Sequence, residues 1–148
     1  MAIAGRLARC LGRNDSRYDV VDRGPAAPIP RDRLARMVLL EDSRGYLAAV
    51  IPASHHLKLS ELRAQTGREL TLAHGEGVRE VFRDCRPDAL PAVGSAYGTL
   101  TWLDDSLLGH DDVYFEAGDH RELVHMDVDE FARLMADAPR GHFSHRVM

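Results

Sequence analysis

Lysine is almost absent from this chain of 148 residues. Its 19 basic residues include a single lysine, Lys58, so any reaction that needs a lysine amine has one candidate. The basic residues are also outnumbered, because 23 acidic residues give a net charge of −4. This negative balance argues against a protein that binds nucleic acid non-specifically.

Cysteines and long apolar runs are scarce as well. Cys10 and Cys85 are isolated and lack C-x-x-C spacing, which argues against a disulfide framework or a zinc knuckle. Two such thiols favour a reduced, cytoplasmic setting. The longest uninterrupted apolar run, residues 47–53, is too short to span a bilayer, so no membrane partner is expected. The arginine-rich first 13 residues predict an amphipathic helix rather than a transit peptide.

What is present is ordinary for a globular domain. The chain is 45% hydrophobic and 28% charged, and its length suits one domain, residues 1–148, with a core of its own. Two apolar runs, residues 37–40 and 46–51, flank the polar segment Asp42-Ser43-Arg44-Gly45. This pattern predicts a β-hairpin with one of the longer loops. Because neither run alternates, both strands should be central and covered on both faces, and Pro52 should end the second.

The remaining segments predict an α+β domain with one mixed β-sheet surrounded by helices. Ser60 is expected to cap a helix that Gly67 ends, and Asp127 and Glu130 form a capping-box pattern before the last helix. The tail, residues 139–148, is expected to be loose. The other expected elements are helices over 3–11 and 77–82, a proline-rich connector over 24–30, a helical turn over 31–36, strands over 18–21, 69–73, 100–103, 113–115 and 123–126, and an irregular loop over 84–98.

Read without reference to any family, the residues offer little catalytic chemistry. There is no G-x-S-x-G motif, neither cysteine has a neighbouring histidine, and His120 and His125 have the wrong spacing for H-E-x-x-H. No metal is therefore expected. Adjacent Asp104 and Asp105 should point to opposite faces of a strand, with one of them capping the next turn. The long Gly/Pro loop is expected to face the Gly-Asp-His turn at residues 117–120.

Several segments, taken in order, carry a resemblance. Residues 37–46, 49–53, 103–108 and 113–120 and the helix over 128–135 resemble the YbaK/prolyl-tRNA synthetase-associated editing domain family, with the similarity extending over about residues 31–137. The resemblance implies a mixed sheet wrapped by helices and hydrolysis of the ester of mischarged aminoacyl-tRNA. It implies the acceptor end of aminoacyl-tRNA as partner, with an aminoacyl-tRNA synthetase as a second candidate, and neither cofactor nor metal.

The chain departs from that family at two motifs. Arg36 stands where the family usually has a lysine before the first hairpin strand. The family's Gly-x-x-x-Pro loop falls on Asp88-Ala89-Leu90-Pro91-Ala92, where both signature residues are changed unless Pro91 substitutes by a one-residue shift. The connector over 24–30 also looks shorter than the usual segment. The positions that match are Gly94, Asp105, Gly118 and His120.

The resemblance implies a site and leaves two functions open. The catalytic positions carried over are Arg36, Asp88, Gly94, Gly118 and His120. The substrate-binding positions are Met37, Ala89, Leu90, Pro91, Ala92, Asp105 and Glu116. One hypothesis is a stand-alone trans-editing deacylase in which water attacks the ester. The other is a catalytically degenerate relative that binds tRNA ends, an aminoacyl-nucleotide-like ligand or a protein partner.

Overall fold

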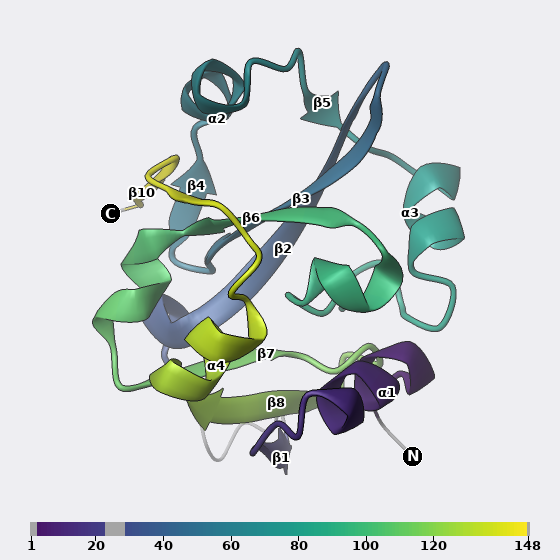
Figure 1. Cartoon of the computed structure of the whole chain (residues 1–148), viewed down its shortest axis with the longest axis vertical. Helices are drawn as coiled ribbons and strands as arrows, with labels where there is room; N and C mark the ends of the chain where they lie inside the picture. The colour runs from purple at the N-terminus through teal and green to yellow at the C-terminus, as the bar shows by residue number, and fades with distance from the viewer. Residues whose placement is uncertain (1–2, 23–28, 148) are drawn as a thin grey trace.

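The computed structural model describes residues 3–22 and 29–147. Its centre is the predicted hairpin, formed by β2 (Leu34–Asp42) and β3 (Gly45–Pro52), which crosses the molecule obliquely in Figure 1. Asp42 pairs directly with Gly45, so the loop is only two residues long, shorter than expected. Gly45 has φ +126°, which a side chain would disfavour, and the Asp42 carboxylate accepts the Arg44 N–H at 2.8 Å. These local bonds allow the tight turn.

One mixed sheet runs through most of the described chain in the order β1-β8-β7-β2-β3-β6-β9, and β5 pairs with β2. The hairpin is central, as predicted, because β7 joins β2 in parallel and β6 joins β3 in parallel. Strand β8 pairs antiparallel with β1 on one side and with β7 on the other. The strands are β1 (Asp19–Asp22), β5 (Thr71–Leu72), β6 (Leu100–Asp104), β7 (Asp112–Glu116), β8 (Glu122–Asp127) and β9 (Arg140–Gly141).

Both faces of the hairpin are buried, as the unbroken apolar runs predict. Ala48 and Val50 belong to a larger core, and the alternate residues Ala49 and Ile51 belong to a smaller one. Strand side chains alternate between faces, so a strand packed on both sides must be apolar throughout. The larger core is completed by α1 (Gly5–Arg13), α4 (Val128–Leu134) and the 3₁₀ turn η2 (Gly94–Tyr97).

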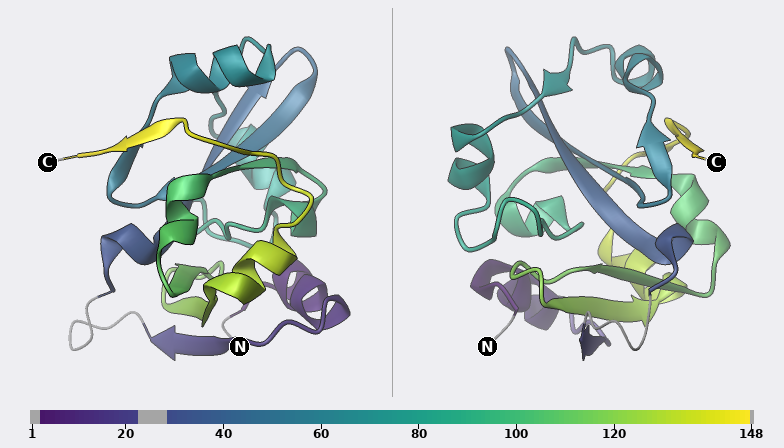
Figure 2. Two further views of the ribbon diagram at one scale, coloured as in Figure 1. Left: turned by 60° about the vertical axis from the view of Figure 1, so that its left-hand side comes forward. Right: turned by 180° about the vertical axis from the view of Figure 1, so that it is seen from behind.

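Helix α2 (Leu59–Thr66) covers the smaller core through Leu62, and Figure 2 shows α2 and α1 at opposite ends of the molecule. The remaining elements are α3 (Glu76–Val81), β4 (His55–Leu57), β10 (Ser144–Arg146) and the 3₁₀ turns η1 (Arg31–Arg33) and η3 (Asp105–Gly109). No helix in the described ranges is both long and apolar enough for a bilayer crossing. Most of the predicted connector over 24–30 lies outside the described residues.

One predicted helix cap is wrong, and another is confirmed in position but not in its hydrogen bonds. Lys58 occupies the N-cap of α2, so Ser60 lies inside the first turn. Asp127 does occupy the N-cap of α4, but its side chain makes no capping hydrogen bond. Glu130 instead accepts the Arg17 backbone N–H at 2.7 Å and pairs with Arg133, so the capping box does not form. The Glu130 carboxylate therefore bonds to a backbone N–H far away in the sequence rather than to the N-cap of its own helix.

The C-terminal segment is ordered, contrary to prediction. It forms β9 beside β6 and β10 beside β4, and Phe143 between them is fully buried. The buried carboxylate of Asp104 accepts hydrogen bonds from the Phe143 N–H at 2.9 Å and the Ser144 hydroxyl at 2.8 Å. The predicted helical turn over 31–36 is also shorter, because only Arg31–Arg33 are helical and Arg36 lies in β2.

Candidate functional site

Arg36 borders three neighbouring cavities of the described structure. Its side chain is exposed, and in the sheet Arg36 of β2 pairs with Ile51 of β3. The cavities measure about 610, 300 and 410 Å³. The 300 Å³ cavity, called the central cavity below, shares Arg31, Arg36 and Ala53 with the first and Arg36, Met37, Pro87 and Leu90 with the third.

The central cavity gathers residues from three distant parts of the chain. Parallel pairing of Ala35 with Phe115 brings Glu116, at the end of β7, beside the start of β2. The loop after α3 supplies Asp88 and Leu90 from the other side. The complete lining is Arg31, Leu34, Ala35, Arg36, Met37, Ala53, Pro87, Asp88, Leu90 and Glu116.

The polar groups of the central cavity have defined partners. The Arg36 guanidinium donates a long hydrogen bond of 3.5 Å to the His55 carbonyl. The Asp88 side chain is 57% exposed and lies 3.4 Å from Arg86 Nε. Glu116 is only 13% exposed, and its Oε2 lies 3.9 Å from His120 Nδ1. The cavity therefore has two cations, Arg31 and Arg36, and two carboxylates on an otherwise largely apolar wall.

The Gly-Asp-His turn meets the Gly/Pro loop, as expected from the sequence. The Gly118 carbonyl accepts the Arg86 N–H at 2.8 Å. Gly118 has φ +111°, and a Cβ there would approach Ala4 Cβ to 2.9 Å, so packing and backbone both require glycine. His120 also has a positive φ, +63°, and its half-exposed ring reaches the cavity through Glu116.

Gly118, His120 and several other predicted positions do not themselves line the central cavity. Ala89, Pro91, Ala92 and Gly94 are buried, the first three of them within the loop itself. A Cβ on Gly94 would overlap the Thr101 hydroxyl, so this glycine permits close packing of η2 on β6. Asp105 is exposed in η3 and borders none of the three cavities.

Two aspartates and one histidine lie close enough together to be considered as metal ligands. Ligand atoms of Asp104, Asp105 and His142 lie within 4.8 Å of one another. Burial favours the protonated form of Asp104, but hydrogen bonds from Ser106, Phe143 and Ser144 outweigh it and lower the carboxyl pKa. Both oxygens of Asp104 are thus engaged in capping η3, as predicted for one of the two aspartates, and in holding the C-terminal segment.

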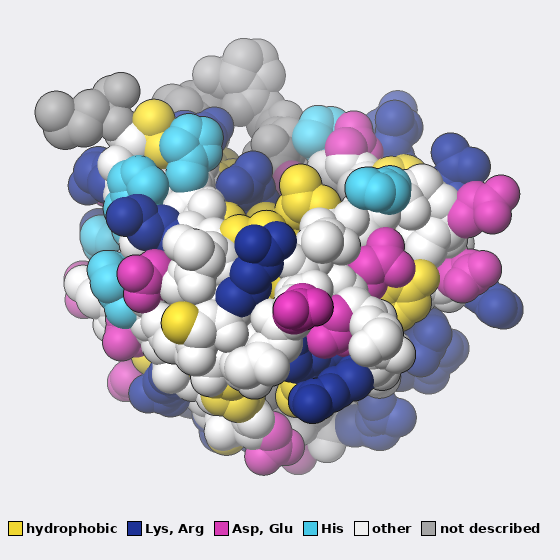
Figure 3. All heavy atoms as spheres, turned by 90° about the horizontal axis from the view of Figure 1, so that it is seen from above, with side chains coloured by type: hydrophobic (Ala, Val, Ile, Leu, Met, Phe, Trp, Pro, Cys, Tyr) yellow, Lys and Arg dark blue, Asp and Glu magenta, His cyan; other side chains and the backbone are white. Residues whose placement is uncertain are grey.

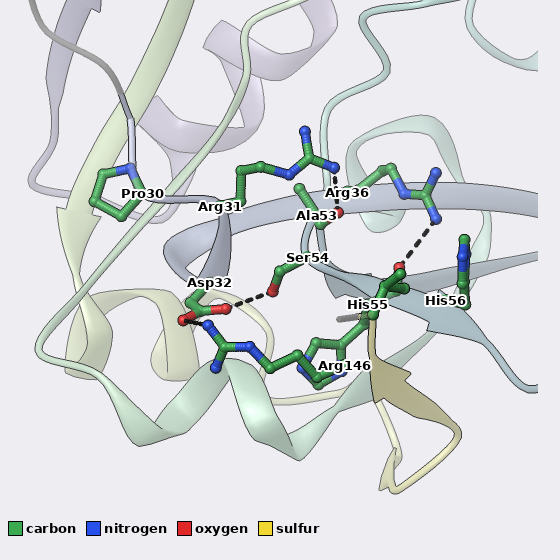
Figure 4. Close-up of a pocket in the computed structure, with 10 residues that line it drawn as sticks. Pro30, Arg31, Asp32, Arg36, Ala53, Ser54, His55, His56 and Arg146 are labelled. Atoms are coloured by element: carbon green, nitrogen blue, oxygen red, sulfur yellow. Dashed lines mark hydrogen bonds and ion pairs between the residues drawn. The ribbon is translucent and has the colours of Figure 1, made fainter.

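The 610 Å³ cavity, called the basic cavity below, was missed by sequence reasoning. Figure 4 shows it between the end of the hairpin, η1 and the C-terminal strand. The adjacent His55-His56 was the one local sign, and nothing near Arg146 in the sequence connects it with residues 31–56. Its lining is Pro30, Arg31, Asp32, Arg36, Ala53, Ser54, His55, His56, Arg146 and Val147.

Comparison with known proteins identifies a matching family model and several solved structures with the same fold. An aminoacyl-tRNA editing domain model matches residues 16–134. A provisionally assigned trans-editing enzyme for prolyl-tRNA synthetase has 20% identity and a TM-score of 0.82, with 96% of each chain covered. The hypothetical protein APE2540 has 18% identity and a TM-score of 0.81, with 95% of this chain and 99% of that chain covered. At these identities the likeness shows the fold alone.

A longer protein contains the same fold. A protein of Marinobacter aquaeolei VT8, provisionally assigned to signal transduction, has 28% identity and a TM-score of 0.80 over 94% of this chain. The present chain spans only 30% of that protein's length. No curated protein matches the chain. Because the domain model covers most of the sequence and the fold agrees, this chain belongs to the aminoacyl-tRNA editing domain family.

Proposed function

We propose that this chain hydrolyses the ester of mischarged aminoacyl-tRNA as a stand-alone editing enzyme. The supporting observation is that Arg36, Met37, Asp88, Leu90 and Glu116 converge on the central cavity in a chain of the editing family. Its volume of about 300 Å³ is at the lower end for small-molecule sites and suits a single aminoacyl group. Because the proposed substrate belongs to translation, we also propose that the chain acts in the cytoplasm.

The proposed reaction needs no side-chain nucleophile. An aminoacyl ester is already activated, so water can attack its carbonyl carbon directly, aided by the terminal ribose hydroxyl. The carbonyl oxygen then becomes negative, and the Arg36 guanidinium would stabilise it together with the backbone N–H groups of Asp88 and Leu90, the two residues of the 88–92 loop that line the cavity. When the carbonyl re-forms, the ester C–O bond breaks and the ribose oxygen leaves as a hydroxyl, taking up the proton that the attacking water releases. Arg36 cannot act as a base, because a guanidinium keeps its proton. Its role is therefore electrostatic.

A second candidate is a catalytically inactive binding protein of the same family. Asp88 favours it, because a carboxylate at the cavity opposes negative charge on the reacting oxygen and its Cβ fills space that a glycine would leave open. Such a protein would bind tRNA ends, an aminoacyl-nucleotide or a protein partner such as an aminoacyl-tRNA synthetase. The neighbouring Arg86 weakens this objection by pairing with Asp88 at 3.4 Å.

A panel of mischarged tRNAs separates the two functions. We expect the wild type to speed loss of the ester for a subset of the panel, and His120→Ala to slow it by about tenfold because the turn beside Glu116 changes. The matched control is His142→Ala, an exposed histidine outside all three cavities, which should leave the rate unchanged. If no ester is lost above the spontaneous rate, the binding protein is the better description.

A further inference from the structure

The basic cavity adjoins the central cavity and carries an excess of positive charge. Three guanidinium groups, from Arg31, Arg36 and Arg146, face one carboxylate, Asp32, and Figure 4 shows their side chains around the same space. Ser54, His55 and His56 complete its polar lining. In Figure 3 histidines gather at the left of the face, the side where β4 and β10 lie, while both signs of charge mix elsewhere.

Each guanidinium is held by the protein but keeps donors to spare. Among the described residues, Arg31 donates from Nη2 to the Ala53 carbonyl at 2.7 Å. Arg146 donates from Nη2 to Asp32 Oδ2 at 2.7 Å, and Ser54 holds the other carboxylate oxygen at 2.5 Å. A guanidinium has five N–H groups arranged as a planar fork. Such anchored forks fit the paired oxygens of a phosphate.

The C-terminal strand builds one wall of this cavity. In the antiparallel pair of β10 and β4, Arg146 lies opposite His55. The His55 ring contacts the Ser144 hydroxyl at 2.8 Å, and Ser144 in turn donates to Asp104. Arg146 is therefore placed by an ordered strand, although its side chain is 64% exposed.

We propose that the basic cavity binds a backbone phosphate of the tRNA acceptor strand, close to the ester held in the central cavity. This inference rests on the proposed function. Arg31, Arg36 and Ala53 border both cavities, so an aminoacyl group in one and a phosphate in the other belong to one continuous ligand. A local basic site also explains how a chain with net charge −4 recognises a nucleic-acid end.

Binding of an uncharged acceptor-stem hairpin ending in CCA tests the site without any need for catalysis. Fluorescence anisotropy across a range of salt concentrations gives both affinity and the number of phosphate contacts. Arg146→Gln should weaken binding about three- to tenfold and reduce the slope of log K against log salt by about 0.7 to 1. Arg146→Lys should retain most of the slope because it retains the charge. Arg31→Gln is a second variant with the same expected direction.

The matched control is Arg13→Gln, an exposed arginine on α1 at the other end of the molecule in Figures 1 and 2. It should leave affinity and slope unchanged. An unchanged slope in both Arg146→Gln and Arg31→Gln, with normal melting temperatures, would overturn the inference. A competition experiment gives a second contrary outcome. If inorganic phosphate displaces the hairpin at phosphate concentrations as low as the hairpin concentrations that saturate the protein, the site serves a free anion and the inference is overturned.

Kinetics distinguish failure of this inference from failure of the proposed function. On a mischarged tRNA that the wild type hydrolyses, Arg146→Gln should raise KM about three- to tenfold with little change in kcat, because the contact is made equally before and during the reaction. An unchanged KM contradicts the phosphate site while leaving hydrolysis established. Absence of hydrolysis contradicts only the proposed function, since the hairpin measurement still reports on the cavity.

Discussion

Burial decides what Cys85 can do. Its sulfur lies 3.1 Å from the Tyr97 hydroxyl and 3.3 Å from Asp84 Oδ1. Burial is the main cause that raises the pKa of Cys85 to about 12, with the acidic neighbour adding to it against a smaller opposite effect of Tyr97. The thiol therefore stays protonated at neutral pH. This agrees with a reaction that uses no cysteine nucleophile.

Alkylation tests that assignment. At pH 8 we expect iodoacetamide to modify Cys85 at least about 100-fold more slowly than in the urea-unfolded chain, because only the thiolate reacts. Peptide mapping by mass spectrometry distinguishes Cys85 from Cys10, which is buried in the core. Equal rates in the folded and unfolded chain would mean that the thiol is accessible and ionised.

Glu130 is a residue whose charge stabilises the fold. Its carboxylate is 7% exposed, and hydrogen bonds from Arg133 and from the Arg17 backbone N–H lower its pKa to about 2. The group ionises near pH 4 in an unfolded chain. A lowered folded pKa means that its stabilisation is present above about pH 4 and is lost as pH falls toward about 2.

Urea unfolding of Glu130→Gln should reveal this dependence. At pH 7 the variant should lose ~1–3 kcal/mol of unfolding free energy, the range for hydrogen bonds to a charged group. The difference from wild type should shrink as pH falls from 4 toward 2. Glu61→Gln, an exposed change on α2, is the control and should stay within about 0.5 kcal/mol. A difference that persists undiminished at low pH would rule out ionisation as the cause.

At the scale of elements, the C-terminal segment is part of the core and also carries Arg146. Phe143 is fully buried with Leu62, Leu70 and the hairpin residue Ile51. Asp104, at the end of β6, holds the segment through the Phe143 N–H and the Ser144 hydroxyl. Packing and hydrogen bonding thus join the end of the chain to the centre of the sheet.

Truncating Phe143 measures how much this attachment contributes. Phe143→Ala should lower the free energy of unfolding by ~3–5 kcal/mol, because it removes a large buried ring and leaves a cavity. Val147→Ala, at a residue 45% exposed in the same segment, should change it by less than about 0.5 kcal/mol. Denaturant unfolding followed by circular dichroism gives both values. A loss below about 1 kcal/mol for Phe143→Ala would indicate a loosely attached segment.

At the scale of the whole molecule, the sheet brings together Arg36 and Asp88, two residues at which this chain differs from the family's motifs. Parallel pairing of β2 with β7 and the loop after α3 place Arg36 and Asp88 on the same central cavity. Each departs from the family pattern, and both would act on one developing charge. Their effects on catalysis should therefore be coupled rather than independent.

Reverting both residues tests whether they impair the site. If they do, Arg36→Lys with Asp88→Gly should raise the deacylation rate by more than the product of the single changes. Asp88→Gly should contribute less than the ~3 kcal/mol of a well-formed oxyanion site. The measurement is a double-mutant cycle on one mischarged tRNA. A fast wild type that the double reversion slows would instead make Arg36 and Asp88 specificity determinants.

Local patterns were enough for the hairpin, for the pair of β7 and β8 and for membership of the family. Two unbroken apolar runs around a polar turn can hardly form anything except buried central strands, because every side chain needs an apolar partner. The resemblance also selected Arg36, Met37, Asp88, Leu90 and Glu116, which the fold brings to one cavity. Their catalytic and binding roles remain predictions.

Tertiary contacts decided the rest. The segment around Phe143 carries no strong local pattern, and its order depends on Asp104 in β6. Glu130 matched a capping box but found Arg17 instead, 113 residues away. The basic cavity likewise exists because β10 returns beside β4 and sets Arg146 opposite His55. Such long-range pairings leave no periodic trace in the chain, since each depends on where distant segments meet rather than on neighbours in sequence.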